Sequence, residues 1–260
     1  MKQSLVDVFN DTQKIFKEDN IAKLISESIG NTKIYADKQD IAFDKLSKDA
    51  KVTVTKFKTI ESASYFKRKF PDKQVCILNF ASATNPGGGV LKGSTAQEES
   101  ICRVTTLYPV LNTQANQKAF YQMHKNRHNA AYTGTIIYTP DIAVLKNDTS
   151  FSRLKQHQLI NVITCAAPNL KAANLTHDQL YDIHVERAKR ILSVAAANHN
   201  DIIVLGAFGC GAFQNPPDIV ADAYKFALQE FKSCFDEINF AIYCNIHDLT
   251  NFNAFKKKLM

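Results

Sequence analysis

The sequence predicts an α/β sandwich, and two observations support this fold class. Short apolar runs typical of buried strands alternate along the chain with longer segments in which apolar residues recur at helical spacing. Two glycine-rich stretches each follow directly on one of the predicted strands. Alternating strands and helices form sheets covered by helices, and such sheets bind ligands at the carboxyl ends of their central strands. We therefore expect a ligand site at the two glycine-rich strand ends.

Composition and charge limit the class of protein. The chain has 260 residues, of which 45% are hydrophobic, so it can bury a large core as one domain or as one domain with an extension. Its net charge of +7 favours anionic partners. The sequence has no arginine-rich run with interleaved aromatic residues, so an anionic nucleotide fits this charge as well as a nucleic acid does. A basic surface without a special partner is the alternative.

The cysteines and the first residues indicate a compartment. No two cysteines form a CxxC pair, and most lie inside apolar runs, namely Cys76, Cys102, Cys165, Cys210, Cys234 and Cys244. This pattern predicts buried free thiols in a reducing compartment rather than disulfides or zinc ligands. The chain starts without the apolar segment of a signal peptide, and no run approaches 18 apolar residues. We expect a cytoplasmic protein without a membrane-spanning segment.

The first 50 residues form a predicted N-terminal extension that is mainly helical. Apolar residues at helical spacing predict helices over residues 5–17 and 21–29. Residues 30–50 read as irregular or weakly paired, and covering one edge of the sheet is a reasonable role for the extension. Residues 51–260 then form the main domain. It opens with a strand over 51–57 and a helix over 60–70.

The other elements of the main domain follow in order. A strand over 75–80 leads into the first glycine-rich stretch, and Ser94 or Thr95 is expected to cap the next helix, which continues to Leu107. Residues 112–127 are helix, loop or both. We expect two short strands around a turn at 139–141, since that turn contains Pro-Asp. The remaining predicted elements are strands over 135–138, 142–145, 159–167, 202–205 and 238–243 and helices over 176–198, 216–231 and 249–259.

The first glycine-rich stretch combines a loop with two carboxylates. Asn85-Pro86 precedes Gly87, Gly88 and Gly89, whose lack of Cβ atoms lets backbone amides approach a phosphate or a sugar. Glu98 and Glu99 follow in the first turn of the predicted helix, and adjacent helical side chains diverge by about 100°. One carboxylate can therefore bind a ligand while the other reacts. The alternative is that both only complement the helix dipole.

The second glycine-rich stretch runs from residue 206 to 213. Gly206, Gly209 and Gly211 permit close approach, so the loop can wrap a diphosphate with its N–H groups. A tight turn without a ligand is the alternative. Phe213 can stack on an adenine or cover a ribose, or it can fill the core.

Both stretches carry a family resemblance. The run NFASATNPGGG, followed by AQEESICRVTTLYP, places seven residues between GGG and QEE. This combination resembles the signature of poly(ADP-ribose) glycohydrolases of the microbial type, a branch of the macrodomain superfamily. The run VLGAFGCGAFQNPP at 204–217 is similar to the second glycine-rich loop of that family. The resemblance covers most of residues 50–247 and implies a macrodomain-like three-layer α/β/α sandwich with a mixed sheet, the catalytic domain being 51–260.

The resemblance also implies roles. Glu99 would be the catalytic carboxylate at the glycosidic oxygen between two riboses, and Glu98 would hold a ribose hydroxyl, with Asn85 on the same distal ribose. This suits glycoside cleavage, which needs an acid for the leaving oxygen and then a base for water. Other implied substrate-binding residues are Gly87, Gly88, Gly89, Gln97, Gly206, Phe208, Gly209, Cys210, Gly211, Ala212, Phe213 and Asn215. The implied ligand is ADP-ribose or its polymer, bound by a monomer without a cofactor.

Two positions depart from the family pattern, and three functions stay open. Thr84 stands where many relatives carry arginine, and Phe208 stands where tryptophan is frequent. Hydrolysis of poly(ADP-ribose) is the leading function. Removal of single ADP-ribose units from protein or nucleic acid, and binding of ADP-ribose without cleavage, are the alternatives.

We expect no metal site, because His124 and His128 lack the glutamate of an HExxH motif and stand beside two cations.

Overall fold

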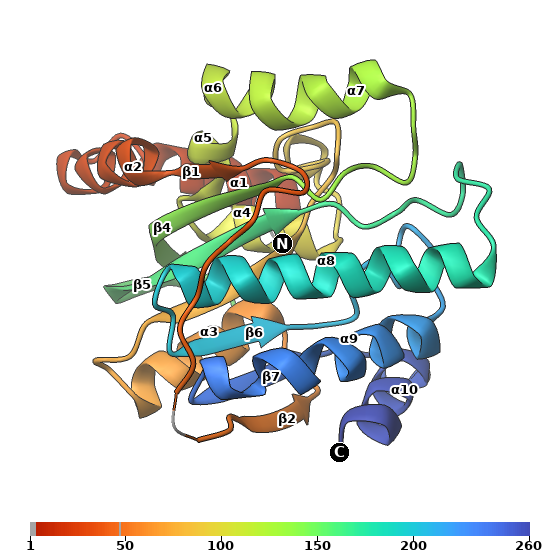
Figure 1. Ribbon diagram of the computed structural model, residues 1–260. Helices are drawn as coiled ribbons and strands as arrows, with labels where there is room; N and C mark the ends of the chain where they lie inside the picture. The colour runs from red at the N-terminus through yellow and green to blue at the C-terminus, as the bar shows by residue number, and fades with distance from the viewer. Residues whose placement is uncertain (1–3, 47) are drawn as a thin grey trace.

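A seven-stranded mixed sheet forms the centre of the protein (Figure 1). The computed structural model describes residues 4–46 and 48–260. The strand order is β1-β4-β5-β3-β6-β7-β2, in which β1 and β4 run antiparallel to their neighbours and the other pairs are parallel. The strands are β1 (Lys33–Tyr35), β2 (Lys51–Thr55), β3 (Val75–Phe80), β4 (Ile136–Lys146), β5 (Arg153–Cys165), β6 (Ile202–Leu205) and β7 (Glu237–Ala241).

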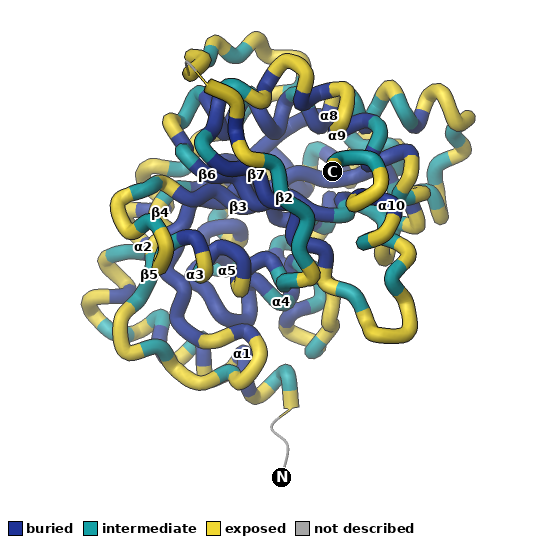
Figure 2. Tube along the Cα trace, turned by 90° about the horizontal axis from the view of Figure 1, so that it is seen from below, coloured by how far each residue is buried: buried dark blue, intermediate teal, exposed yellow. Residues whose placement is uncertain are grey.

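Helices cover both faces of the sheet, as predicted. Side chains alternate between the two faces along β3, so Ile77 packs with α3 and α4, while Leu78 packs with α8 and α9. One layer contains α1 (Leu5–Ile15), α2 (Asp19–Asn31), α3 (Thr59–Lys69), α4 (Gln97–Val104) and α5 (Leu107–Leu111). The other layer contains α8 (His177–Ala197) and α9 (Pro217–Phe231), and α10 (Thr250–Leu259) packs on α9. The strands β3, β6 and β7 between the two layers are buried, whereas the edge strand β2 is only partly buried (Figure 2).

The N-terminal segment is built into this architecture. Phe9 and Ile15 of α1 and Ile21 of α2 lie in the same apolar core as α3 and α4. β1 pairs with β4 and so adds a strand at that edge of the sheet. Residues 4–35 therefore contribute to both the core and the sheet.

The predicted turn at 139–141 is wrong. β4 runs through it without interruption, and its register to β5 shifts between Thr139 and Ile142. Asp141 has a φ of 56°, and its N–H bonds to the Asn161 side chain at 3.1 Å. Proline is tolerated at a bulge, where the regular ladder of hydrogen bonds is broken. The Pro-Asp pair therefore marks a bulge. β5 also begins at Arg153, six residues before the predicted start at residue 159. The prediction missed the first half of the strand because that half is polar and partly exposed.

The start of α4 also differs from the prediction. Ala96 occupies the N-cap position without a side-chain bond, because Ser94 belongs to the preceding loop, where its N–H bonds to the carbonyl of Gly89. The helix ends at Val104, and Leu107 begins α5. The segment after α5 is helical, through α6 (Gln114–Asn116), η2 (Gln117–Gln122) and α7 (Met123–Arg127).

The packing of α1 generates a test of its place in the core. Phe9 is buried, and its ring meets the Tyr108 ring edge-on at a centroid distance of 5.2 Å. We expect Phe9→Ala to lower the free energy of unfolding by about 3–5 kcal/mol, the range for deleting a buried phenylalanine ring. Urea unfolding should show one transition at a lower midpoint. The exposed neighbour Asn10→Ala is the control, and an unchanged midpoint for Phe9→Ala would show that α1 is dispensable for the core.

Candidate active site

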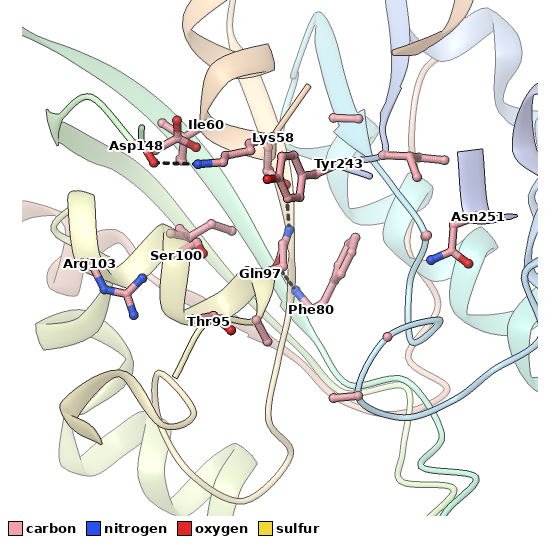
Figure 3. Close-up of a pocket in the computed structure, with 18 of the residues that line it drawn as sticks. Lys58, Ile60, Phe80, Thr95, Gln97, Ser100, Arg103, Asp148, Tyr243 and Asn251 are labelled. Carbon is pink, nitrogen blue, oxygen red and sulfur yellow. Dashed lines mark hydrogen bonds between the residues drawn. The ribbon is translucent and has the colours of Figure 1, made fainter. Parts of the chain in front are cut away.

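The two glycine-rich loops emerge side by side because β3 and β6 are parallel neighbours. A cavity of about 570 Å³ lies there, between α4, the N-terminus of α3 and the second loop (Figure 3). Gln97, Ser100 and Arg103 line it from α4. Five residues of the second loop also line it, namely Ala207, Gly209, Gly211, Ala212 and Phe213. Pockets of this size suit a nucleotide-sized ligand.

Gln97 ties α4 to the sheet. Its Oε1 accepts the N–H of Phe80 at 2.8 Å (Figure 3). Its Nε2 donates to the carbonyl of Leu78 at 2.7 Å and to Thr59 Oγ1 at 3.0 Å. β6 pairs with β3 only as far as Ile77. The Gln97 amide therefore takes over the hydrogen bonds at the end of β3, and it fixes the helix turn that carries the two glutamates.

Glu98 is buried and points toward the sheet. Its Oε2 accepts the N–H of Ser82 at 2.7 Å, and its Oε1 accepts from Asn79 Nδ2 at 3.3 Å. Burial raises the pKa of the Glu98 carboxyl to about 8; the bonds from Ser82 and Asn79 act against this rise, and the Glu99 charge adds to it. The loss of hydration outweighs the two donors. A solvated helix-dipole carboxylate would not be buried in this way.

Glu99 takes different partners, as the divergence of adjacent helical side chains requires. Its Oε1 accepts the N–H of Gly89 at 2.8 Å. Its Oε2 is buried and has no hydrogen-bond partner among the described residues. One oxygen is therefore fixed by the loop, and the other is a buried acceptor without a partner in that part of the chain. Neither glutamate and none of the three glycines Gly87, Gly88 and Gly89 lines the cavity, which borders α4 through Gln97, Ser100 and Arg103 instead.

The close approach of the first loop requires glycine at two positions. Gly88 has a φ of +58°, and a Cβ atom there would lie 2.3 Å from Glu99 Oε1 and 3.1 Å from Glu98 Oε2. Gly87 has a φ of +67°, and a Cβ atom there would lie 2.7 Å from the ring of Tyr108. Both the backbone conformation and the space exclude a side chain.

The glycines of the second loop have different functions in the structure. A Cβ atom on Gly206 would lie 2.8 Å from the carbonyl of Ala241, and one on Gly209 would lie 2.6 Å from Asn215 Nδ2. These two glycines serve the packing of the loop. Gly211 has nothing within 4 Å of its Cβ position, so its open side faces space in which a ligand can lie.

Asn215 holds the second loop from within the protein. Its Nδ2 donates to the carbonyls of Pro168 and Gly209, and its Oδ1 accepts from His184 Nε2 at 2.9 Å. Burial lowers the pKa of His184 to about 4, so the ring is neutral and donates from Nε2. Asn215 is thus a supporting residue whose side chain is buried.

The predicted binding residues divide by location. Phe213 is half-buried in the cavity lining, which favours the ligand interpretation over a core position. Phe208 is buried against Phe80, with ring centroids 5.7 Å apart, so its side chain fills the core. Cys210 is partly buried beside the second-loop lining, and Asn85 is exposed on the first loop.

Sequence reasoning missed several residues around the cavity. Lys58 donates to the carbonyl of Asp148, and its ammonium lies 5.5 Å from the centre of the Tyr243 ring (Figure 3). Tyr243 is 67% exposed at the cavity and offers an aromatic face. These residues come from three segments far apart in the sequence, and none belongs to a motif that would single it out.

Metal-binding groups, cysteines and long apolar helices bear on the class of protein. Within residues 4–46 and 48–260, no group of three or more His, Cys, Asp or Glu side chains is placed to hold a metal ion. His124 Nε2 instead contacts Thr133 Oγ1 at 2.9 Å. All six cysteines are free thiols, and four of them are buried. Among the described helices, none combines the length and apolar character needed to cross a bilayer.

The buried Glu98 generates a test based on stability. Its pKa is about 8 in the folded protein and near 4.5 in the unfolded chain, so the unfolded state loses this proton first as the pH rises. This group therefore lowers stability progressively between pH 4.5 and 8. We expect Glu98→Gln to gain stability relative to the wild type, by on the order of 3 kcal/mol, between pH 5 and pH 8.5. Thermal unfolding at both pH values measures this, and a difference independent of pH would contradict the burial argument.

Comparisons with known proteins identify the family. Residues 3–147, more than half of the chain, match the sequence model of the microbial-type PARG catalytic domain. The structure is similar to the crystal structure of poly(ADP-ribose) glycohydrolase from Thermomonospora curvata, with 26% identity over 98% of this chain and 99% of that chain and a TM-score of 0.90. The same enzyme bound to the inhibitor ADP-HPD gives 26% identity, the same coverage and a TM-score of 0.86.

A second bacterial enzyme supports the assignment. Poly(ADP-ribose) glycohydrolase from Deinococcus radiodurans, in complex with ADP-ribose, is 30% identical over 90% of this chain and 96% of that chain, with a TM-score of 0.80. No curated protein matches the sequence. The family match begins at residue 3, so it includes the N-terminal helices that the sequence motifs left outside. The chain therefore belongs to the microbial-type poly(ADP-ribose) glycohydrolase family.

Proposed function

We propose that this protein hydrolyses poly(ADP-ribose) to ADP-ribose and that Glu99 is its catalytic acid and base. The observation that carries the proposal is the Glu99 carboxylate, buried at the glycine loop with Oε1 bonded and Oε2 without a partner among the described residues. We infer that this unpaired oxygen is the one that exchanges a proton with the substrate once the substrate is bound. The ADP-ribose and ADP-HPD complexes of the two related enzymes support the choice of ligand.

The reaction uses one carboxyl group twice. Protonated Glu99 gives its proton to the glycosidic oxygen between two riboses, and the bond from that oxygen to the anomeric carbon breaks. The anomeric carbon passes through an oxocarbenium-like state. The Glu99 carboxylate then takes a proton from a water molecule whose oxygen bonds to that carbon. Both products carry new hydroxyl groups, and Glu99 regains its proton.

The other groups hold the substrate. Glu98 contacts a hydroxyl of the ribose that is cleaved, and Asn85 contacts the same ribose from the exposed side of the loop. The N–H groups around Gly211 face the diphosphate, because this part of the second loop borders the cavity and leaves open space. The nucleoside end extends toward the aromatic faces of Phe213 and Tyr243, which line the same cavity. Modified proteins carrying the polymer are the proposed partners.

Glu99→Gln is the direct test of this proposal. The glutamine keeps the size of the side chain but cannot give or take a proton, so we expect release of ADP-ribose from purified polymer to fall by at least about 10³-fold. Binding of ADP-ribose, measured by calorimetry, should stay within a few fold. The exposed glutamate Glu27, changed to Gln, is the control. An active Glu99→Gln protein would remove Glu99 from the mechanism.

The same assay separates the other functions. A wild type that releases ADP-ribose from a singly modified protein or nucleic acid, but not from the polymer, would be a mono-ADP-ribosyl hydrolase. A wild type that binds ADP-ribose and cleaves neither substrate would be a binding module.

Gly88→Ala tests the close approach of the first loop. Its Cβ atom would overlap Glu99 Oε1 in a backbone conformation that alanine avoids. We expect the loop to move away from Glu99 and kcat to fall by about 10²-fold, as for a displaced catalytic group. Gly30→Ala, where no atom lies within 4 Å, is the matched control and should keep full activity. Full activity of Gly88→Ala would mean that the loop geometry is unimportant for turnover.

A further inference from the structure

A closed ring of hydrogen bonds links the glycine loop to both turns of α4. Glu99 Oε1 accepts the N–H of Gly89 at 2.8 Å, and the carbonyl of Gly89 accepts the N–H of Ser94 at 3.2 Å. The carbonyl of Ser94 accepts from the guanidinium group of Arg103. Arg103 follows Glu99 by four residues on α4, about one helical turn, so the helix itself closes the ring.

Arg103 is an unusual residue to find in this place. It is only 2% exposed, and among the described residues no carboxylate lies within salt-bridge distance of its guanidinium group. Its Nε also has no hydrogen-bond partner within that part of the chain. Burial lowers the pKa of the guanidinium, and the Glu99 charge acts in the opposite direction. A buried cation without an ion pair is destabilising, so a packing role alone does not account for it.

The N-terminal helix α1 also contacts the backbone of Arg103. Thr12 Oγ1 of α1 donates to the carbonyl oxygen of Arg103 at 2.7 Å. Val6 of α1 also packs on the loop, because a Cβ atom on Gly93 would lie 3.1 Å from its Cγ2. The backbone of Arg103 is thus fixed, and its side chain transmits that position to Ser94.

We propose that Arg103 is a positioning residue that holds the glycine loop closed on Glu99 during turnover. The inference rests on the proposed function of Glu99. Without the Arg103 bond, the carbonyl of Ser94 loses its hydrogen bond to α4, and this part of the loop is then held through packing, with Val90 in the core. The N–H of Gly89 is then less firmly fixed at the Glu99 carboxylate. A displacement of about 1 Å at a catalytic group can lower the rate by about 10²-fold.

The side-chain chemistry favours arginine over lysine for this function. The planar guanidinium presents its donors in a fixed direction, whereas an ammonium on a flexible stem does not fix the carbonyl that it binds. Lysine should therefore restore only part of the activity that an uncharged residue loses.

A direct contact between Arg103 and a substrate phosphate is the competing role, because Arg103 lines the cavity. The two roles differ in kinetics. A positioning residue affects mainly kcat, whereas a phosphate ligand affects the affinity for ADP-ribose as well.

The test compares Arg103→Met and Arg103→Lys with Arg190→Met and Arg190→Lys. Arg190 is a matched control, because it is also buried and its guanidinium also donates to backbone carbonyls, those of Ala36, Gln39 and Gly134. Three quantities are measured: kcat on purified polymer, the Kd of ADP-ribose, and amide hydrogen exchange over residues 89–94.

We expect kcat to fall about 10²-fold for Arg103→Met and about tenfold for Arg103→Lys. The Kd should change less than threefold, and amides 89–94 should exchange faster than in the wild type. The Arg190 variants should unfold at lower temperature but keep kcat and the exchange of these amides.

Three outcomes would overturn the proposal. An unchanged kcat for Arg103→Met would remove Arg103 from turnover. A rise in Kd as large as the fall in kcat would assign it to the ligand. Unchanged exchange over residues 89–94 would show that the ring does not hold the loop. If the wild type itself releases no ADP-ribose, the function of Glu99 is wrong, while the exchange measurement still decides whether Arg103 holds the loop.

Discussion

Two carboxylates buried in one helical turn are the constraint around which the active site is built. Burial removes the hydration of both groups, and two ionised carboxylates in the same helical turn would repel each other. The structure offsets this with N–H groups from the strand end and the glycine loop, at Ser82 for Glu98 and at Gly89 for Glu99. Because no side chain fits between these donors and the carboxylates, the loop must carry glycine at 88. The glycine at 88 is therefore a consequence of how closely the loop approaches the two buried carboxyl groups.

The sheet fixes the position of the helix turn that carries the two glutamates. β3 is the central strand at which β5 and β6 meet, and its last residues extend beyond β6. Gln97 uses the backbone groups freed there, so the first turn of α4 is tied to a buried central strand of the sheet. The carboxylates are then positioned by an amide that itself does no chemistry. This explains why Gln97 lines the cavity while all its polar atoms are engaged with the protein.

Local sequence patterns predicted the strands whose ends are set by neighbouring residues in the chain. The apolar runs at 75–80 and 202–205 are bounded by polar or glycine residues, and both strands have the predicted bounds. The pattern failed at Pro140-Asp141, because whether such a pair forms a turn or a bulge depends on the partner strand, here through Asn161. It also failed at Ser94, whose N–H bonds to Gly89 within the loop and not to the first turn of α4. The motif assigned roles to Glu98 and Glu99 but none to Arg103, although Arg103 lies in the same run, and Tyr243 lies outside both motifs and reaches the cavity only through the fold.

The contacts of α1 have a consequence for the order in which the protein forms. Thr12 bonds to Arg103 across a sequence separation of 91 residues, and Lys146 bonds to the carbonyl of Val8 across 138. During synthesis, α1 emerges long before either partner exists, and contacts at such separations form late because the intervening chain must first be ordered. Neither hydrogen bond of α1 can therefore form until its partner, Arg103 or Lys146, has been synthesised. The ring that joins Gly89, Ser94 and Arg103 accordingly gains its support from α1 only through contacts between distant parts of the chain.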